Sequence, residues 1–83
     1  MKPLTHYGRL AERHWRQFCP QLVRALETEG RLEDILLEAE ERTDADLDSL
    51  RRHFIRKGLT AQQAHDRAWE IVRNRYIFLP PEN

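Results

Sequence analysis

The sequence predicts an all-α fold: a small bundle of three to four helices arranged around one long central helix. The first observation is the stretch Arg31–Lys57, whose 27 residues contain no Gly or Pro. At about 100° per residue its apolar residues fall within a sector about 120° wide, as expected of a helix packed on a core. The second observation is that Gly30 and Gly58 bracket this stretch. The residues of the apolar sector are Leu32, Ile35, Leu36, Ala39, Thr43, Leu47, Leu50 and Phe54.

The segment before the central helix is predicted to be helical with an interruption at Pro20, and Thr5 is a suitable N-cap. Proline lacks a backbone donor and its ring clashes with a carbonyl of the preceding turn. Either one helix kinks at Pro20, or two helices (about 5–18 and 20–29) meet there with Pro20 in a first turn. We favour a break or sharp kink at Cys19–Pro20. The expected inner face comprises Leu4, Tyr7, Leu10, Ala11, His14, Trp15, Phe18, Leu22, Ala25 and Leu26.

Within the central stretch, Thr43–Asp46 reads T-x-x-D and could start a new helix. The apolar register continues across Thr43 without a slip, so we predict one unbroken helix. Gly58 should end it, and the capping box Thr60–Gln63 should begin a last helix over about 61–75. The expected inner face of that helix comprises Ala61, Ala64, His65, Ala68, Trp69, Ile71, Val72 and Tyr76.

The chain ends in an apolar and Pro-containing tail, residues 76–83 of what we interpret as a single helical domain. In one interpretation Tyr76, Phe78 and Leu79 lie across the bundle and cover its open end. In the other, these three residues form a docking segment for a partner or a second copy. Truncation after Arg75 should separate the two, since only the first interpretation requires the tail for folding.

The 83 residues are 34% charged, with a formal net charge of zero. Neutrality arises by cancellation, because residues 1–24 carry +4, residues 25–48 carry −8 and residues 49–83 carry +4. A chain this short buries a modest core, so we expect a marginal monomer or a domain stabilised by self-association. The single cysteine, Cys19, fits a reducing compartment. No apolar run suggests a secretory signal or a membrane span, and we expect a cytoplasmic chain without a membrane partner.

No motif predicts catalysis or metal binding. Asp44-Ala45-Asp46-Leu47-Asp48 resembles the start of a calcium loop, but Ser49 replaces the required Gly and Ile55 the required Glu. The acidic residues from Glu33 to Asp48 are expected on a solvated helix exterior, where general acid–base chemistry is disfavoured. His14, His53 and His65 could converge inside a bundle, yet no two have the i, i+4 spacing of ligands on one helical turn. We therefore predict no enzyme, no cofactor, no metal and no small-molecule substrate.

Arginine makes up twelve of the fourteen basic residues and suits planar contacts with phosphate or carboxylate. Several arginines lie opposite the apolar face of the first helical segment, and others follow in the central helix. The candidate nucleic-acid contacts are Arg9, Arg13, Arg16, Arg24, Arg51 and Arg52. Our main hypothesis is a non-enzymatic protein-interaction or regulatory module, with a protein partner or a homodimer in which basic and acidic faces meet. The alternative is a nucleic-acid-binding accessory protein that uses the arginine face.

A further pattern runs from residue 7 to residue 75. It consists of Tyr7-Gly8-Arg9-Leu10, Pro20, Gly30-Arg31-Leu32, Leu36, Gly58-Leu59-Thr60, Ala64, Trp69 and Asn74. In these positions the chain resembles the family of small transposon-encoded TnpV proteins. The resemblance implies an accessory role in a bacterial mobile element or in a domesticated relative. The chain departs from the family because it lacks the longer N-terminus and ends with Tyr76–Asn83. The resemblance carries over no catalytic or binding residue.

Overall fold

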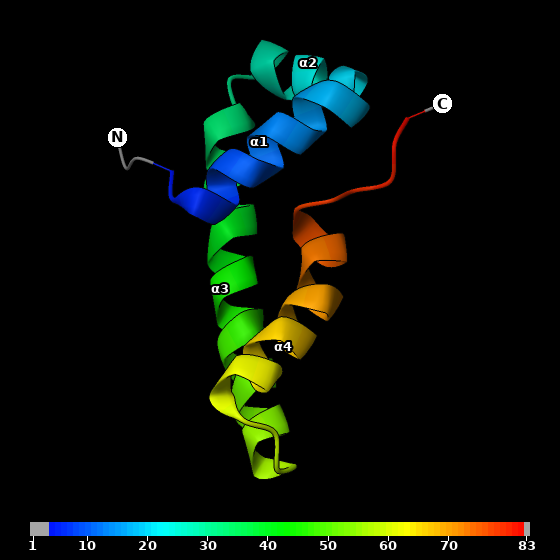
Figure 1. Cartoon of the computed structure of the whole chain (residues 1–83). Helices are drawn as coiled ribbons and strands as arrows, with labels where there is room; N and C mark the ends of the chain where they lie inside the picture. The colour runs from blue at the N-terminus through cyan, green and yellow to red at the C-terminus, as the bar shows by residue number, and fades with distance from the viewer. Residues whose placement is uncertain (1–3, 83) are drawn as a thin grey trace.

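The computed structural model describes residues 4–82, and this part of the chain contains four helices and no strand. The helices are α1 (His6–Phe18), α2 (Pro20–Thr28), α3 (Leu32–Arg56) and α4 (Ala61–Tyr76). The predicted all-α bundle with a long central helix is confirmed, as is the break before Pro20 (Figure 1).

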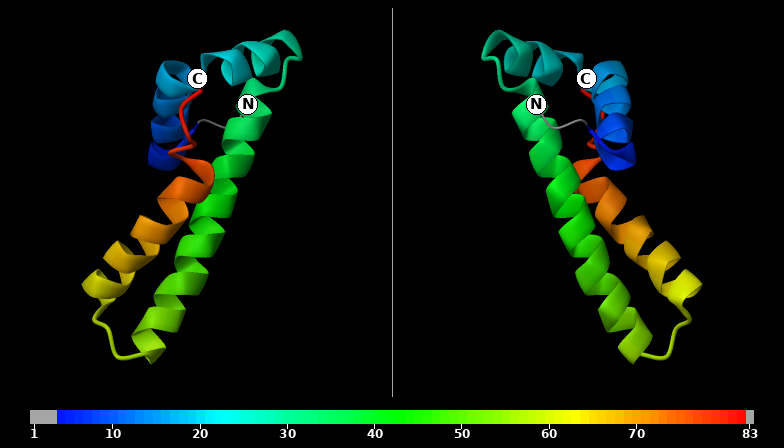
Figure 2. Two further views of the ribbon diagram at one scale, coloured as in Figure 1. Left: turned by 90° about the vertical axis from the view of Figure 1, so that its right-hand side faces the viewer. Right: turned by 90° about the vertical axis from the view of Figure 1, so that its left-hand side faces the viewer.

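The long helix α3 is the axis on which the other elements are placed. Helix α4 runs antiparallel to the C-terminal half of α3, while α1 crosses its N-terminal half and α2 lies beyond its start (Figure 1). Seen from the sides, α3 and α4 are closest at the end of α4 and diverge toward their connecting loop (Figure 2). The molecule is elongated and thin, with principal extents of 46 × 32 × 14 Å.

The helix boundaries follow local sequence signals. Pro20 is the first residue of α2, where its missing N–H costs nothing. At the start of α4, Thr60 Oγ1 accepts a hydrogen bond from the Gln63 N–H (3.2 Å), and Gln63 Oε1 accepts one from the Thr60 N–H (3.1 Å). Gly30 and Gly58 have φ of 69° and 102°, values that favour glycine, and they terminate α2 and α3.

Helix α3 continues through Thr43 as predicted. The buried Thr43 hydroxyl donates to the Ala39 carbonyl one turn earlier (2.8 Å) instead of capping a new helix. Because the central helix is unbroken, the same rod supports α1 at one end and α4 at the other.

The buried residues form two neighbouring clusters along α3. The first joins α1, α2, the start of α3 and the tail, and includes Trp15, Leu36 and Ile77. The second joins α3 and α4 through Leu47, Ala68 and Val72. In both clusters alanines or other small residues allow the helices to approach closely.

Some inner-face predictions were wrong in detail. Phe18, Ala25, Ala61 and Ile71 are exposed, whereas Cys19, Val23 and Ile77 are buried. The buried line along the first two helices and the residue that joins them is Gly8, Ala11, Trp15, Cys19, Val23 and Leu26. For Ala25 and Val23, the difference arises because α2 turns away at Pro20 and thereby presents a different side to α3.

One acidic residue also departs from the expected solvated exterior. Glu40 of α3 is only 2% exposed, and its Oε2 accepts a hydrogen bond from the Thr5 N–H at 2.6 Å. Thr5 occupies the predicted N-cap position of α1, but its own side chain makes no capping bond. A carboxylate near the N-terminus of α1 is stabilised by the helix dipole, so Glu40 fixes where α1 crosses α3.

Among residues 4–82, no helix has both the length and the apolar character needed to cross a membrane.

Candidate interaction surface

The C-terminal tail, here residues 77–82, lies against α1 and the start of α2. Ile77 is fully buried, and its carbonyl accepts a hydrogen bond from Trp15 Nε1 at 3.0 Å. Two residues later, His14 Nε2 donates to the Leu79 carbonyl at 2.8 Å. The tail is therefore held by its backbone as well as by its apolar side chains.

The end of the tail supplies the cap that α2 lacks. Both carboxylate oxygens of Glu82 accept backbone hydrogen bonds at the start of α2, from Gln21 (2.9 Å) and Leu22 (3.0 Å). The Glu82 N–H in turn donates to the Phe18 carbonyl at 2.8 Å. A negative charge at a helix N-terminus is favourable, so this contact holds the end of the tail against the start of α2.

Cys19 lies beneath the tail, and its thiol donates a weak hydrogen bond to the Pro80 carbonyl (3.4 Å). Burial raises the pKa of the Cys19 thiol, and the nearby Glu82 carboxylate raises it further. A buried thiol with a raised pKa is a poor nucleophile, which makes this cysteine a structural residue.

The most extended surface feature is a series of neighbouring aromatic rings, which we call the aromatic strip. Its members, in order of contact, are His6, Tyr7, Trp69, Phe78, His14 and Phe18. Tyr7 of α1 stacks on Trp69 of α4 with ring centroids 5.4 Å apart, and Trp69 meets Phe78 edge-on at 6.1 Å. Phe78 continues to His14 at 5.1 Å. The strip thus joins α1, α4 and the tail.

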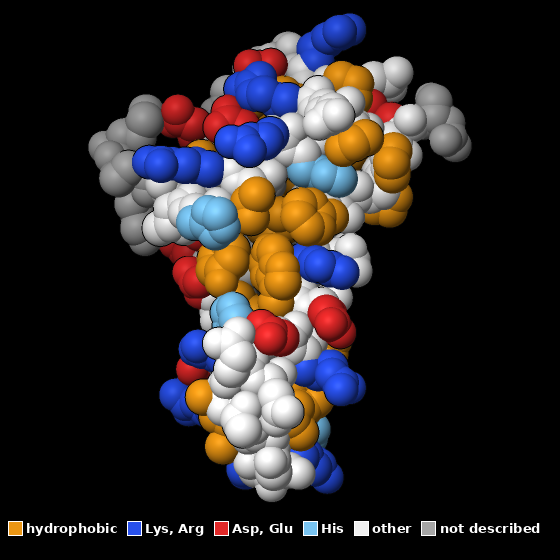
Figure 3. All heavy atoms as spheres, in the orientation of Figure 1, with side chains coloured by type: hydrophobic (Ala, Val, Ile, Leu, Met, Phe, Trp, Pro, Cys, Tyr) orange, Lys and Arg blue, Asp and Glu red, His pale blue; other side chains and the backbone are white. Residues whose placement is uncertain are grey.

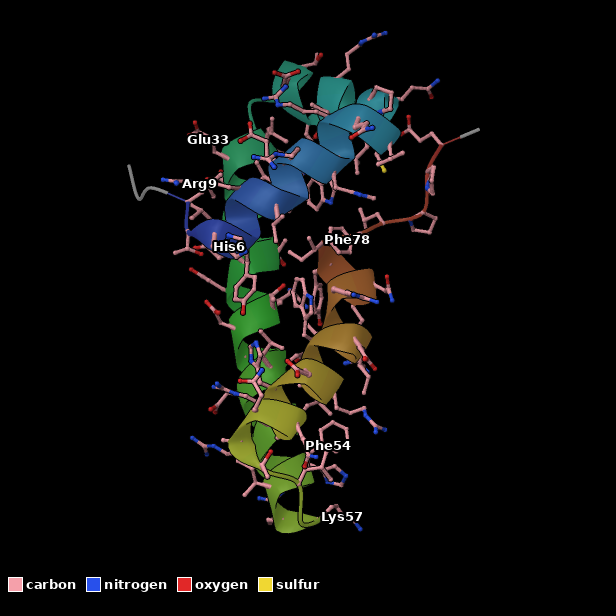
Figure 4. All side chains as sticks on the ribbon, viewed as in Figure 1. His6, Arg9, Glu33, Phe54, Lys57 and Phe78 are labelled. Atoms are coloured by element: carbon pink, nitrogen blue, oxygen red, sulfur yellow. The ribbon has the colours of Figure 1, made fainter. Side chains whose placement is uncertain are left out.

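The strip is partly open to solvent. His6 and Phe18 at its ends are exposed, and the four rings between them are half-buried. Figure 3 shows a patch of apolar side chains between α1 and α4 on this face. In Figure 4, His6 and Phe78 lie on the same face at opposite sides of the patch. Clustered aromatic rings of this kind are enriched at protein interfaces.

The predicted nucleic-acid contacts divide into two groups. Arg16 is paired with Glu12 (2.9 Å) and Glu27 (3.6 Å), and these neighbours raise the pKa of its guanidinium. Arg51 and Arg52 both pair with Asp48, at 3.6 and 3.1 Å.

The other group comprises Arg9, Arg13 and Arg24, which are exposed and form no ion pair with any residue in the range 4–82. Arg9 and Arg13 lie on α1, and Arg9 is labelled in Figure 4. Basic side chains also gather at the far end of α3, near the labelled Lys57.

The three predicted partner-binding residues do not share one surface. Phe78 belongs to the aromatic strip, whereas Tyr76 and Leu79 line a shallow hollow of about 340 Å³ with Trp15, Ile35 and Ala39. The Tyr76 hydroxyl donates to Asp46 Oδ2 at 2.8 Å, and this bond, together with burial, raises the pKa of the hydroxyl. All three side chains are half-buried against their own chain.

The histidines do not converge. His14 belongs to the strip, while His53 is exposed beside Phe54 near the end of α3. Within residues 4–82, no three His, Cys, Asp or Glu side chains gather closely enough to hold a metal ion.

The strip was missed in the sequence because its rings come from three separate segments. The sequence pattern predicts Tyr7, His14 and Trp69 on inner helix faces and Phe78 in the tail. The available signal was that aromatic residues stand at the edges of the apolar faces of two helices, yet sequence alone does not show which edges meet.

Comparison of the chain with protein-family models, with curated proteins and with solved structures finds no match in any of the three.

Proposed function

We propose that this chain is a non-enzymatic protein-interaction module, accessory to a larger assembly such as that of a bacterial mobile element. The observation that carries the proposal is the aromatic strip, a continuous row of partly exposed rings from α1, α4 and the tail. Large aromatic side chains contribute much binding energy at low entropic cost, because few of their bonds rotate. The surrounding helices hold the rings in place, so little ordering is needed on binding.

The test compares the wild-type chain with a strip variant and a matched control. The strip variant is His6→Glu with Phe18→Glu, two exposed positions at the ends of the strip. The control is Ile55→Glu, because Ile55 is 50% exposed and lies far from the strip, near the end of α3. All three chains should show equal helicity by circular dichroism.

Tagged chains are cross-linked in the cells of origin, purified and examined by mass spectrometry. We expect one identified protein to be retained by the wild type and by the Ile55→Glu control, and to be lost with the strip variant. Equal recovery of the same proteins with all three chains would show that the strip binds nothing and would overturn the proposal.

A second candidate function is nucleic-acid binding, favoured by Arg9, Arg13 and Arg24, which no acid in the described range neutralises. Three phosphate contacts predict an affinity for duplex DNA that falls about 40-fold between 50 and 200 mM salt. Fluorescence anisotropy with the wild type and with a triple variant carrying alanine at these positions tests this. Equal binding by both chains, or none at 50 mM salt, would reject it.

A further inference from the structure

The two halves of the C-terminal tail differ in how deeply they are buried. Ile77 is fully buried and Leu79 is half-buried, whereas the side chains of residues 80–82 are exposed. Local opening of a folded chain requires least free energy where few apolar side chains are buried. The end of the tail can therefore leave the protein surface while Ile77 stays in the core.

Helix α2, on which the end of the tail rests, has little support of its own. It has nine residues, and isolated helices shorter than about 12–15 residues are marginal in water. Of its nine side chains, those of Val23 and Leu26 are buried. The ion pair between Glu27 and Arg16 of α1, at 3.6 Å, is exposed and adds little stability.

The Glu82 carboxylate supports the first turn of α2, where the helix has no cap of its own. Cys19 at the N-cap makes no side-chain capping bond, and Pro20 has no N–H to donate. The next two N–H groups, of Gln21 and Leu22, both donate to Glu82, at 2.9 and 3.0 Å. Figure 2 shows the end of the tail beside the junction of α1 and α2. Because the same two bonds hold the end of the tail and the first turn of α2, each depends on the other.

We propose that residues 80–82 and α2 form a latch, which opens and closes as one unit while α1, α3 and α4 stay folded. Cys19 lies beneath the latch, is 3% exposed and contacts the Pro80 carbonyl through its thiol at 3.4 Å. Opening exposes Cys19 together with Val23 and Leu26, and so uncovers an apolar surface that the closed chain hides. The inference goes beyond the proposed function, because the latch contains none of the rings of the aromatic strip.

The experiment uses Cys19, the single cysteine of the chain, as a probe of opening. Its thiol reacts with the reagent DTNB when the latch is open, so the labelling rate relative to that of the urea-unfolded chain measures the open fraction. The first variant is Glu82→Ala, which removes the cap. We expect labelling to be faster by about 2- to 30-fold, the range that corresponds to loss of a helix N-cap.

Two control variants separate the latch from general effects of charge and stability. Glu33→Ala also removes an exposed acidic residue from the first turn of a helix, but that helix is α3. Ala45→Gly lies in the interior of α3 and destabilises the whole chain by an amount comparable to the loss of a cap. Because α3 stays folded when the latch opens, both controls affect the closed and open forms equally. Neither should change the labelling rate by more than about twofold.

The controls also define the results that would overturn the proposal. Equal acceleration by Glu82→Ala and Ala45→Gly would show that Cys19 becomes accessible only when the whole chain unfolds. Equal acceleration by Glu82→Ala and Glu33→Ala would show a general effect of charge. An unchanged rate in Glu82→Ala would show that the end of the tail does not hold the latch closed. Each of these three results rejects the latch.

Hydrogen exchange of the wild-type chain tests whether the tail end and α2 open together. The backbone amides of residues 24–28 should exchange with the same opening equilibrium as the Cys19 thiol, and those in the middle of α3 should be protected more strongly. If α2 is protected as strongly as α3 while Cys19 is labelled readily, the tail end opens alone and the proposed unit is wrong.

Discussion

Truncation after Arg75 is expected to leave the chain largely unfolded at 25 °C. The deletion removes Ile77, which is fully buried, and the half-buried Phe78 and Leu79. Full burial of one such side chain contributes about 1.5–3 kcal/mol. Trp15 Nε1, whose partner is the Ile77 carbonyl, would be left without an acceptor, at a cost of about 1–3 kcal/mol. Domains of this size are stable by only about 4–12 kcal/mol in total, so the tail accounts for a large share.

Circular dichroism and urea denaturation of the truncated chain measure this effect. A graded version of the experiment compares a buried isoleucine with an exposed one: Ile77 is 0% exposed and Ile71 is 37% exposed. We expect Ile77→Ala to lower the free energy of unfolding by about 2–5 kcal/mol, and Ile71→Ala by less than about 1 kcal/mol. A truncated chain with intact helicity and a cooperative transition would instead favour the tail as a docking segment.

The features that the sequence predicted well are those specified by neighbouring residues. A capping box requires only Thr60 and Gln63, and a proline start requires only Pro20. The continuity of α3 was predicted from a single periodic pattern across Thr43. Each of these signals acts within about one helical turn or along one helix, so no knowledge of tertiary packing is needed to interpret it.

Tertiary packing decided the features that were missed. Val23 is buried in place of Ala25 because of the direction in which α2 leaves Pro20, which the apolar pattern does not encode. Ile77 lies just beyond the end of α4, where no helical periodicity applies. Its carbonyl accepts a hydrogen bond from Trp15 Nε1, and this bond holds the residue in the core.

The candidate surface needed still more information than the core. Tyr7 and Trp69 are 62 positions apart in the sequence, and they stack only because α1 and α4 both pack on α3. The arginines were located correctly on an outer face, but the sequence does not show which of them pair with acidic residues. Glu12 and Glu27 neutralise Arg16, while Arg9 and Arg13 stay without an acid among the described residues, and only the structure distinguishes them.

Placing proline at position 45 is expected to disrupt the whole arrangement, because every other element is placed by α3. Ala45 lies in the interior of α3 and is exposed, so the substitution leaves the core side chains unchanged. Proline removes one backbone hydrogen bond and clashes with the preceding turn, so Ala45→Pro should lower the free energy of unfolding by at least about 3 kcal/mol.

The matched control is Ala45→Gly, which weakens the helix without breaking it and should cost about 1 kcal/mol. Urea denaturation gives both values. Tryptophan fluorescence reports the environments of Trp15 and Trp69 together, and both should become more exposed in Ala45→Pro as α1 and α4 lose their common support. If Ala45→Pro lowers the free energy of unfolding no more than Ala45→Gly does, the two halves of α3 tolerate separation near Thr43. The strip would then not depend on a continuous central helix, and the surface proposed for partner binding would lose its rigid foundation.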